Sequence, residues 1–337
     1  MRNTGLPAFP PALLLAVLIG CQEGAATDGE AARERITAPR ETPTAEDAAN
    51  ATYAGIYDES ITLRQGRYEG EPLDPGGATI PTVGLFDELQ LLADLDGDGA
   101  NERSVLLWET AGGRGTSVYL ALVRSVGEAS ATLVGDRVAI RALEVSGGLL
   151  QMEVLRAGDG DAVCCPGELA TMRWRTSRDG LGLVSDEVDG RLGLSTVAGE
   201  WRLATKEAAN DILMAGRILE GSEAAGDLRV IVADDDAALI AAGLDLEITL
   251  TINPDGTVAG RSGCNQYSGS ARFEEPNSLG FGPLGMTLMA CPESVMLLEQ
   301  EYLSRLQAVT SVGFHVGKLA LGWQTEDAHA TLLFVPR

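Results

Sequence analysis

The residues whose types and spacing best suit chemistry form one short acidic run, DLDGDGANE, over residues 94–102. Three aspartates stand at positions 1, 3 and 5 of a calcium-binding loop, a glycine stands at position 6, and a glutamate at position 9. Calcium takes several hard oxygen ligands at about 2.3–2.6 Å, and this spacing curls carboxylates around one point. The run therefore predicts a candidate Ca²⁺ site whose ligands are Asp94, Asp96, Asp98, the carbonyl of Ala100, and Glu102.

Two interpretations of the acidic run stay open. Position 12 is Val105 instead of the bidentate glutamate, and both flanks look like strands, so the helix–loop–helix form of the motif is excluded. The run resembles the strand–loop–strand calcium loops of integrin-like propellers, which also lack the last glutamate. The alternative is a tight turn whose Asp and Gly residues satisfy the backbone while the carboxylates face salt-screened water.

The other chemically capable residues are few. Cys164 and Cys165 are adjacent, whereas a redox site typically has Cys-x-x-Cys at a helix N-terminus, so a thiol-redox role is an alternative to two small buried side chains. His315 and His329 have no second ligand at metal spacing, and no Gly-x-Ser-x-Gly elbow is present. Asn265 suits a polar groove or, more simply, a turn that satisfies its own backbone. We therefore predict a protein that is not an enzyme.

Charge and the N-terminal residues indicate the compartment. The formal net charge is −24, which disfavours binding to nucleic acid or to an anionic membrane surface by charge. An apolar run over residues 13–19, too short to span a bilayer, ends in Leu-Ile-Gly-Cys, which resembles the lipobox of bacterial lipoprotein signal peptides. The resemblance implies a signal peptide over 1–20 and a lipidated Cys21 bearing acyl chains such as palmitate.

The same resemblance implies a location. Gln22 follows the cysteine, and lipoproteins without Asp at that place usually reach the outer membrane, facing the periplasm, in cells with two membranes. Residues 21–50 are rich in Ala, Glu, Thr and Pro, and cannot bury enough apolar surface to offset their ordering entropy. We expect this segment to be a flexible tether between the membrane and the folded part.

The elements that must position these residues are mostly strands. Over 51–194, short runs of alternating apolar and polar residues are separated by turns such as Gly147-Gly148, with no sustained helical period. This pattern predicts an antiparallel sandwich or half-open barrel of unassigned function, with the acidic run between two of its strands.

The part over 197–337 combines strands with one helix. A strand pair is expected around the turn Asp255-Gly256. After Pro292, which suits the first helical turn, apolar residues recur at spacings of three and four, which predicts an amphipathic helix. These apolar residues are Val295, Leu298, Tyr302, Leu306 and Val309. Glu301 and Arg305 are expected to pair one turn apart on its outer face.

Several ordered motifs of this part resemble the META domain, the family of the heat-shock lipoprotein HslJ. They are Trp201, the block DGTVAGRSGCNQYSG, the block GPLGMTLMAC with Thr287 and Cys291, and the run EQEYLSRL with Glu299 and Gln300. The segment between Trp201 and the next expected strand is longer than usual for the family. The resemblance implies a barrel-like α+β fold, an envelope location and a link to stress tolerance, and it implies that Cys264 and Cys291 lie close enough to bridge.

Together these observations predict an α+β, mostly antiparallel β protein, in which a β-sandwich or barrel-like domain precedes a META-like barrel with one amphipathic helix. We expect a non-catalytic, lipid-anchored envelope protein with a stress-tolerance or interaction role, whose partner could be an envelope protein or peptidoglycan. The alternatives are a calcium-dependent binding module and a thiol-redox envelope protein.

Overall fold

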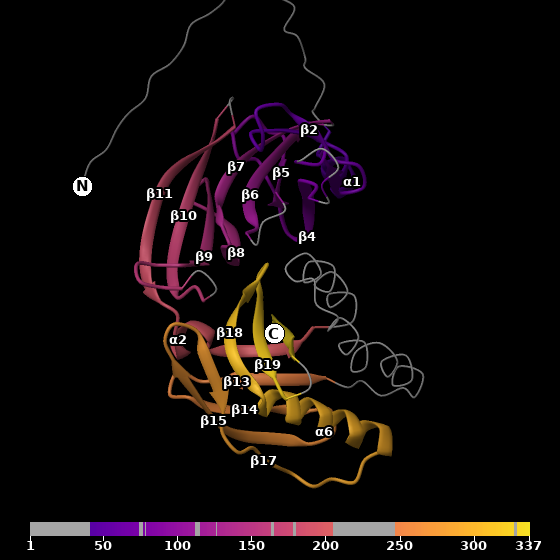
Figure 1. The fold of residues 1–337 in the computed structure, drawn as a ribbon, viewed down its shortest axis with the longest axis vertical. Coiled ribbons are helices and arrows are strands. Elements are labelled where there is room, and N and C mark those ends of the chain that lie inside the picture. The colour runs from indigo at the N-terminus through magenta and orange to yellow at the C-terminus, as the bar shows by residue number, and fades with distance from the viewer. Residues whose placement is uncertain are drawn as a thin grey trace, which may run out of the picture. The chain divides into compact units, whose positions relative to one another are not determined.

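The computed structural model describes residues 41–73, 77, 79–111, 115–125, 127–162, 165–177, 180–204, 247–326 and 329–337. Strands dominate these residues, so the expected α+β, mostly antiparallel β class is confirmed (Figure 1). The expected signal peptide over 1–20, Cys21 and most of the expected tether lie outside them. No helix within the described ranges is long and apolar enough to cross a membrane.

The first eleven strands form two sheets. A seven-stranded sheet has the order β2-β1-β7-β6-β5-β4-β3, and a four-stranded sheet the order β11-β10-β9-β8. Neighbours are antiparallel except β1 and β7, and the whole is a nearly closed barrel. The strands are β1 (Thr52–Ala54), β2 (Ile61–Thr62), β3 (Arg67–Glu69), β4 (Thr82–Ala93), β5 (Glu102–Thr110), β6 (Ser117–Ser125), β7 (Glu128–Asp136), β8 (Ala139–Ser146), β9 (Leu149–Arg156), β10 (Glu168–Ser177) and β11 (Gly180–Arg191).

A short helix precedes these strands. Helix α1 (Ala45–Ala49) is closed by a capping box in which Thr44 and Asp47 bond each other's backbone N–H. Ala48 is fully buried, and its carbonyl accepts a hydrogen bond of 2.8 Å from the Tyr53 hydroxyl. The end of the segment expected to be a tether is therefore folded, because small alanines fit against the sheet where larger residues are not needed.

Both faces of the larger sheet are covered. Leu106, Leu120 and Leu122 belong to one apolar cluster, together with side chains of β8–β10. Their strand neighbours Val105 and Leu107 belong to a second cluster with α1 and β1. Because successive side chains of a strand point to opposite faces, continuous apolar runs such as VLL in β5 are buried on both sides.

The later strands form a closed eight-stranded antiparallel barrel. Their sheet has the order β14-β13-β12-β20-β19-β18-β16-β15, and β15 pairs with β14 to close it, while β17 adds at the edge of β15. The elements are α2 (Leu194–Val197), β12 (Gly199–Leu203), β13 (Ile248–Ile252), β14 (Thr257–Ser262), β15 (Gln266–Glu274), β16 (Ser278–Phe281), β17 (Gly285–Met286), α6 (Glu293–Gln307), β18 (Val309–His315), β19 (Lys318–Gln324) and β20 (His329–Pro336).

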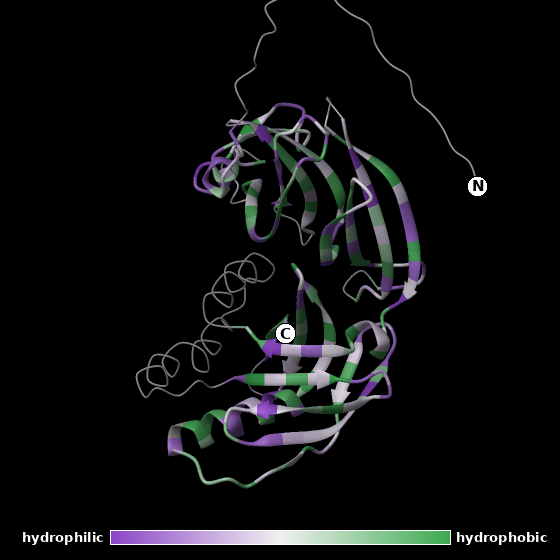
Figure 2. Ribbon diagram, turned by 180° about the vertical axis from the view of Figure 1, so that it is seen from behind, coloured by the Kyte–Doolittle hydropathy of each residue, from purple (hydrophilic) through white to green (hydrophobic). Residues whose placement is uncertain are grey.

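The predicted turn and helix of this barrel are confirmed. Asn253 and Thr257 close the hairpin through a hydrogen bond of 2.9 Å, and Gly256 has φ +84°, which a side chain would oppose. Helix α6 begins after Pro292, and all five of the residues predicted for its apolar face are buried, although Val309 already opens β18. Figure 2 shows apolar and polar residues alternating along the strands. The expected ion pair of Glu301 and Arg305 is present at 2.5 Å, but Arg305 is buried over the Trp323 ring and does not lie on an outer face as predicted.

Candidate functional site

The acidic run forms the loop between two paired strands. Strands β4 and β5 are antiparallel, and Ala93 lies opposite Glu102 where the loop begins and ends. Gly97 and Gly99 have φ +78° and +88°, a conformation that side chains disfavour. The two glycines therefore let the chain reverse within a few residues, which brings Asp94 and Asp96 near Glu102.

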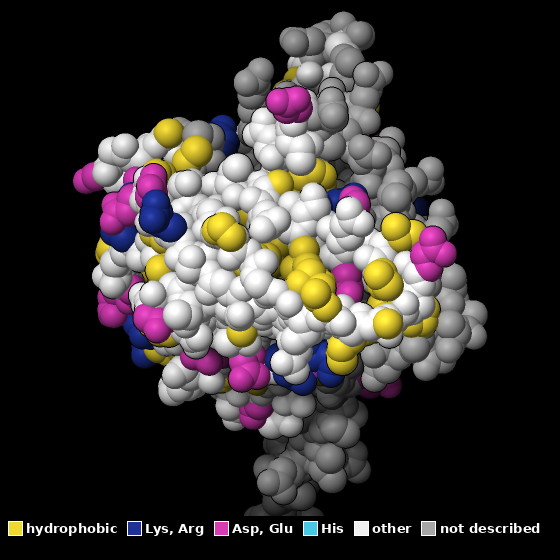
Figure 3. Space-filling view, turned by 90° about the horizontal axis from the view of Figure 1, so that it is seen from below, with side chains coloured by type: hydrophobic (Ala, Val, Ile, Leu, Met, Phe, Trp, Pro, Cys, Tyr) yellow, Lys and Arg dark blue, Asp and Glu magenta, His cyan; other side chains and the backbone are white. Residues whose placement is uncertain are grey.

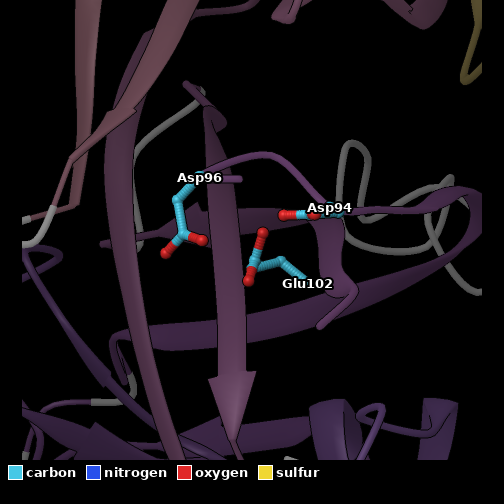
Figure 4. A group of neighbouring side chains, drawn as sticks. All are labelled: Asp94, Asp96 and Glu102. Carbon is cyan, nitrogen blue, oxygen red and sulfur yellow. The ribbon is translucent and has the colours of Figure 1, made fainter. Parts of the chain in front are cut away.

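The loop gathers three of its carboxylates. Oxygens of Asp94, Asp96 and Glu102 lie within 4.8 Å of one another, and Figure 4 shows the three side chains pointing toward a common point. Asp94 and Asp96 are exposed, whereas Glu102 is 1% exposed. The predicted ligand Asp98 lies outside this group, and it accepts a hydrogen bond of 2.9 Å from the N–H of Ala100, whose carbonyl was the other predicted ligand.

The carboxylates also bond the loop's own backbone. Asp94 accepts from the N–H groups of Gly97 at 2.8 Å and Gly99 at 3.1 Å, and Glu102 accepts from Leu95 at 2.8 Å. Burial raises the pKa of Glu102, the charges of the aspartates add to this effect, and the Leu95 N–H opposes it. Negative charge is thus costly at Glu102, and a bound cation would relieve that cost.

A second polar cluster joins α6 to the turn after β14 and is centred on Glu299, which is 3% exposed. Its carboxylate accepts hydrogen bonds from the Ser262 hydroxyl at 2.7 Å, the Asn265 N–H at 2.5 Å and the Asn265 side-chain amide at 2.8 Å. Burial disfavours the ionised form, but these hydrogen bonds outweigh burial and hold the pKa of Glu299 below its ordinary value.

Asn265 connects that cluster to the segment before α6. Its side-chain oxygen accepts from the Thr287 hydroxyl and from the Met289 N–H, both at 2.8 Å. Asn265 therefore does more than satisfy its own turn, which was the simpler expectation. Its partners are 22 and 24 residues away in the sequence, so no local pattern identified this role.

A disulfide reinforces the same connection. Cys264 and Cys291 are bonded, with their Cα atoms 6.5 Å apart and a sequence separation of 27. The bond joins the turn after β14 to the residue that precedes Pro292 and α6. The pairing implied by the family resemblance is therefore present in the structure.

A surface cleft of about 630 Å³ lies between α6 and the segment held by Asn265 and the disulfide. Its lining is mainly apolar and rich in methionine, and several of these side chains are exposed, Leu288 most of all at 91%. Figure 3 views this end of the molecule, where apolar side chains gather on the surface. The lining includes Leu284, Met286, Leu288, Met289, Met296 and Leu303.

Sequence reasoning missed this cleft. The methionines of GPLGMTLMAC were read only as part of a family motif. Their signal was an apolar run interrupted by Gly and bounded by prolines, which limits regular structure to the two residues of β17 and leaves apolar side chains unburied.

Of the other cysteines, the structure describes Cys165. Cys165 lies in the loop between β9 and β10, where its N–H donates to the Ala162 carbonyl at 2.8 Å, and Cys164 lies outside the described residues. Asp161 organises this loop by accepting from the N–H groups of Gly158 and Gly167 and by pairing with Arg191 at 2.5 Å. These contacts, with the Arg191 bond first, lower the pKa of Asp161 to about 2.

Comparisons with known proteins identify the C-terminal part. The META domain family matches residues 232–337. An NMR structure of a protein from Burkholderia xenovorans is 31% identical over a match that covers 28% of this chain and 68% of that chain, with a TM-score of 0.24. No curated protein matches the chain. The barrel also includes β12, at Gly199–Leu203, ahead of the matched residues. The C-terminal part of the chain, over residues 232–337, therefore belongs to the META domain family.

Proposed function

We propose that the protein is a non-catalytic lipoprotein of the cell envelope, anchored through Cys21, with a stress-tolerance or interaction role. The META domain supports an HslJ-like, envelope- or stress-related family. The observation that carries the non-catalytic part of the proposal is Glu299. This buried acid uses its carboxylate to hold Ser262 and Asn265, so it serves the barrel and is not available to a substrate.

The envelope role is tested by complementation in cells that lack the gene. Wild-type protein should restore survival of heat and envelope stress, and Cys21→Ala should fail to restore it while losing the incorporation of radiolabelled palmitate. Glu299→Gln keeps the size of the side chain but replaces one accepting oxygen by a donating NH₂ group, so it should lower stability. The protein that still folds should restore survival, because no catalytic group is lost. A deletion strain with unchanged stress survival would overturn the stress role. Palmitate incorporation by Cys21→Ala would overturn the anchor.

A second function is supported by the three converging carboxylates of Asp94, Asp96 and Glu102: a calcium-dependent binding module. Calcium bound only to the folded chain stabilises it by about 2.7 kcal/mol when its concentration is a hundredfold above Kd. The full chain carrying Cys21→Ser should therefore melt higher in millimolar calcium than in chelator. An unchanged melt together with no heat on calcium titration would end this second proposal.

A further inference from the structure

The methionine-lined cleft has two walls that the fold holds in different ways. One wall is a stripe of α6 that includes Met296, Gln300, Leu303 and Ser304. The other wall is the segment 284–290, which is fixed by Asn265 through Thr287 and Met289 and by the disulfide at Cys291. The backbone of the cleft is therefore held in place, while its methionine side chains are long, unbranched and adaptable.

Apolar side chains are exposed on both walls. Leu288 is 91% exposed, Met289 54%, Met296 49% and Met286 41%. Adjacent exposed apolar groups of this kind mark surfaces that bind another apolar group, and flexible methionines suit side chains of varied shape.

The edge of β17 has main-chain groups with which an added strand can pair. The Thr287 N–H donates to the Gln266 carbonyl at 3.0 Å, so Met286 and Tyr267 form a non-hydrogen-bonded pair of the ladder. The N–H and C=O of Met286 consequently point away from β15. Within the described residues β17 is the last strand in its sheet order, so no strand there pairs with this edge. An extended peptide can add to such an edge.

The negative charge of the chain indicates that a partner of the cleft is basic. No Lys or Arg lines the cleft, and the carboxylate of the lining residue Glu299 is already bonded by Ser262 and Asn265. The exposed acid beside the cleft is Glu293, which lies one helical turn before Met296 on α6. The whole chain has a formal net charge of −24. A second copy of the chain and an anionic lipid surface would be repelled, whereas a basic segment would be attracted.

From these observations we propose that the cleft between α6 and residues 284–290 binds an extended, apolar and basic peptide segment of another protein. The segment pairs its backbone with Met286, inserts apolar side chains among the methionines, and keeps Lys or Arg close to Glu293. This inference rests on the proposed interaction role. Its test uses an unlipidated chain and no calcium, so its failure can be told apart from failure of the lipid anchor.

The test measures binding of short fluorescent peptides to the full chain carrying Cys21→Ser. The probe is a nine-residue peptide of alternating Leu and Lys, its comparison is the same peptide with Glu in place of Lys, and neutral phosphatidylcholine vesicles serve as the lipid arm. The cleft variant is Leu288→Gln with Met289→Gln. Its matched control is Leu183→Gln with Val188→Gln on β11, where both residues are exposed, at 53% and 58%. All four residues are exposed, so melting temperatures should stay close to that of the parent chain.

The proposal expects the Leu/Lys peptide to bind, with affinity reduced about tenfold or more in the cleft variant and unchanged in the control variant. The Leu/Glu peptide should bind at least about tenfold more weakly than the Leu/Lys peptide at low salt. Equal affinity for both peptides, equal loss in the two variants, no peptide binding, or binding to the vesicles alone would each overturn it.

Discussion

At the scale of single residues, two buried carboxylates have opposite surroundings. Glu299 accepts hydrogen bonds from Ser262 and Asn265 that favour its ionised form. Glu102 is equally buried, but its neighbours are the carboxylates of Asp94 and Asp96. Glu299 therefore has its hydrogen-bond partners within the protein, whereas the carboxylates around Glu102 lack the positive charge that a bound cation would supply.

Glu102→Gln should separate the two interpretations of the acidic loop. Because the folded-state pKa of Glu102 is raised, its contribution to stability is present below the unfolded-state pKa and is lost as pH rises through the folded-state pKa. In chelator at pH 7 the variant should therefore melt higher than the parent chain, and at pH 4 the two should converge. In calcium only the parent chain should gain stability, as read by thermal melts.

Glu128→Gln, an exposed acid at the start of β7, is the control for this substitution and should leave the calcium response unchanged. If Glu102→Gln responds to calcium as the parent chain does, the carboxylate cluster is an ordinary turn and not a metal site.

Asn265→Ala should destabilise the META barrel. The substitution removes the side-chain hydrogen bond to Glu299 and those from Thr287 and the Met289 N–H, leaving a buried charge less well paired. A loss of about 2–4 kcal/mol is expected for polar contacts of this kind, measured by urea unfolding. Gln266→Ala, at an exposed neighbouring position, should cost far less. Equal losses in the two variants would show that Asn265 is not the centre of the network.

At the scale of elements, the sequence predicted most where the pattern is local. The spacing of Val295, Leu298 and Tyr302 predicted the helix and its buried face, and Asp255-Gly256 predicted the hairpin. Helix α1 was missed, because a five-residue helix has too few apolar positions to show a period. The cleft was missed because its form depends on contacts between residues more than twenty positions apart, such as Asn265 with Met289.

The disulfide is the element-scale contact whose removal is most informative. Cys264→Ser with Cys291→Ser opens a loop with a sequence separation of 27, which should lower the free energy of unfolding by about 3 kcal/mol in the chain-entropy view. The segment 284–290 should also exchange its amide hydrogens faster, because the disulfide is one of its attachments, beside Asn265 and the pairing of β17 with β15. Denaturant unfolding and hydrogen exchange check both effects, with Cys165→Ser as the control. Unchanged exchange would mean that Asn265 and the β17–β15 pairing hold the segment without the disulfide.

At the scale of the whole molecule, an acidic folded part follows a proposed lipid anchor at Cys21. A net charge of −24 keeps that part soluble and repels anionic headgroups, so attachment to a membrane would depend on acyl chains and not on surface charge. Both the acidic loop and the methionine-lined cleft would then face the same compartment, where free calcium and exported proteins are accessible.

The most direct measurement of this central claim is mass spectrometry of the N-terminal peptide from protein purified out of its native membrane fraction. The account predicts a peptide that begins at Cys21 and carries the mass of its acyl groups. A mature N-terminus at any other residue, or an unmodified Cys21, would contradict it.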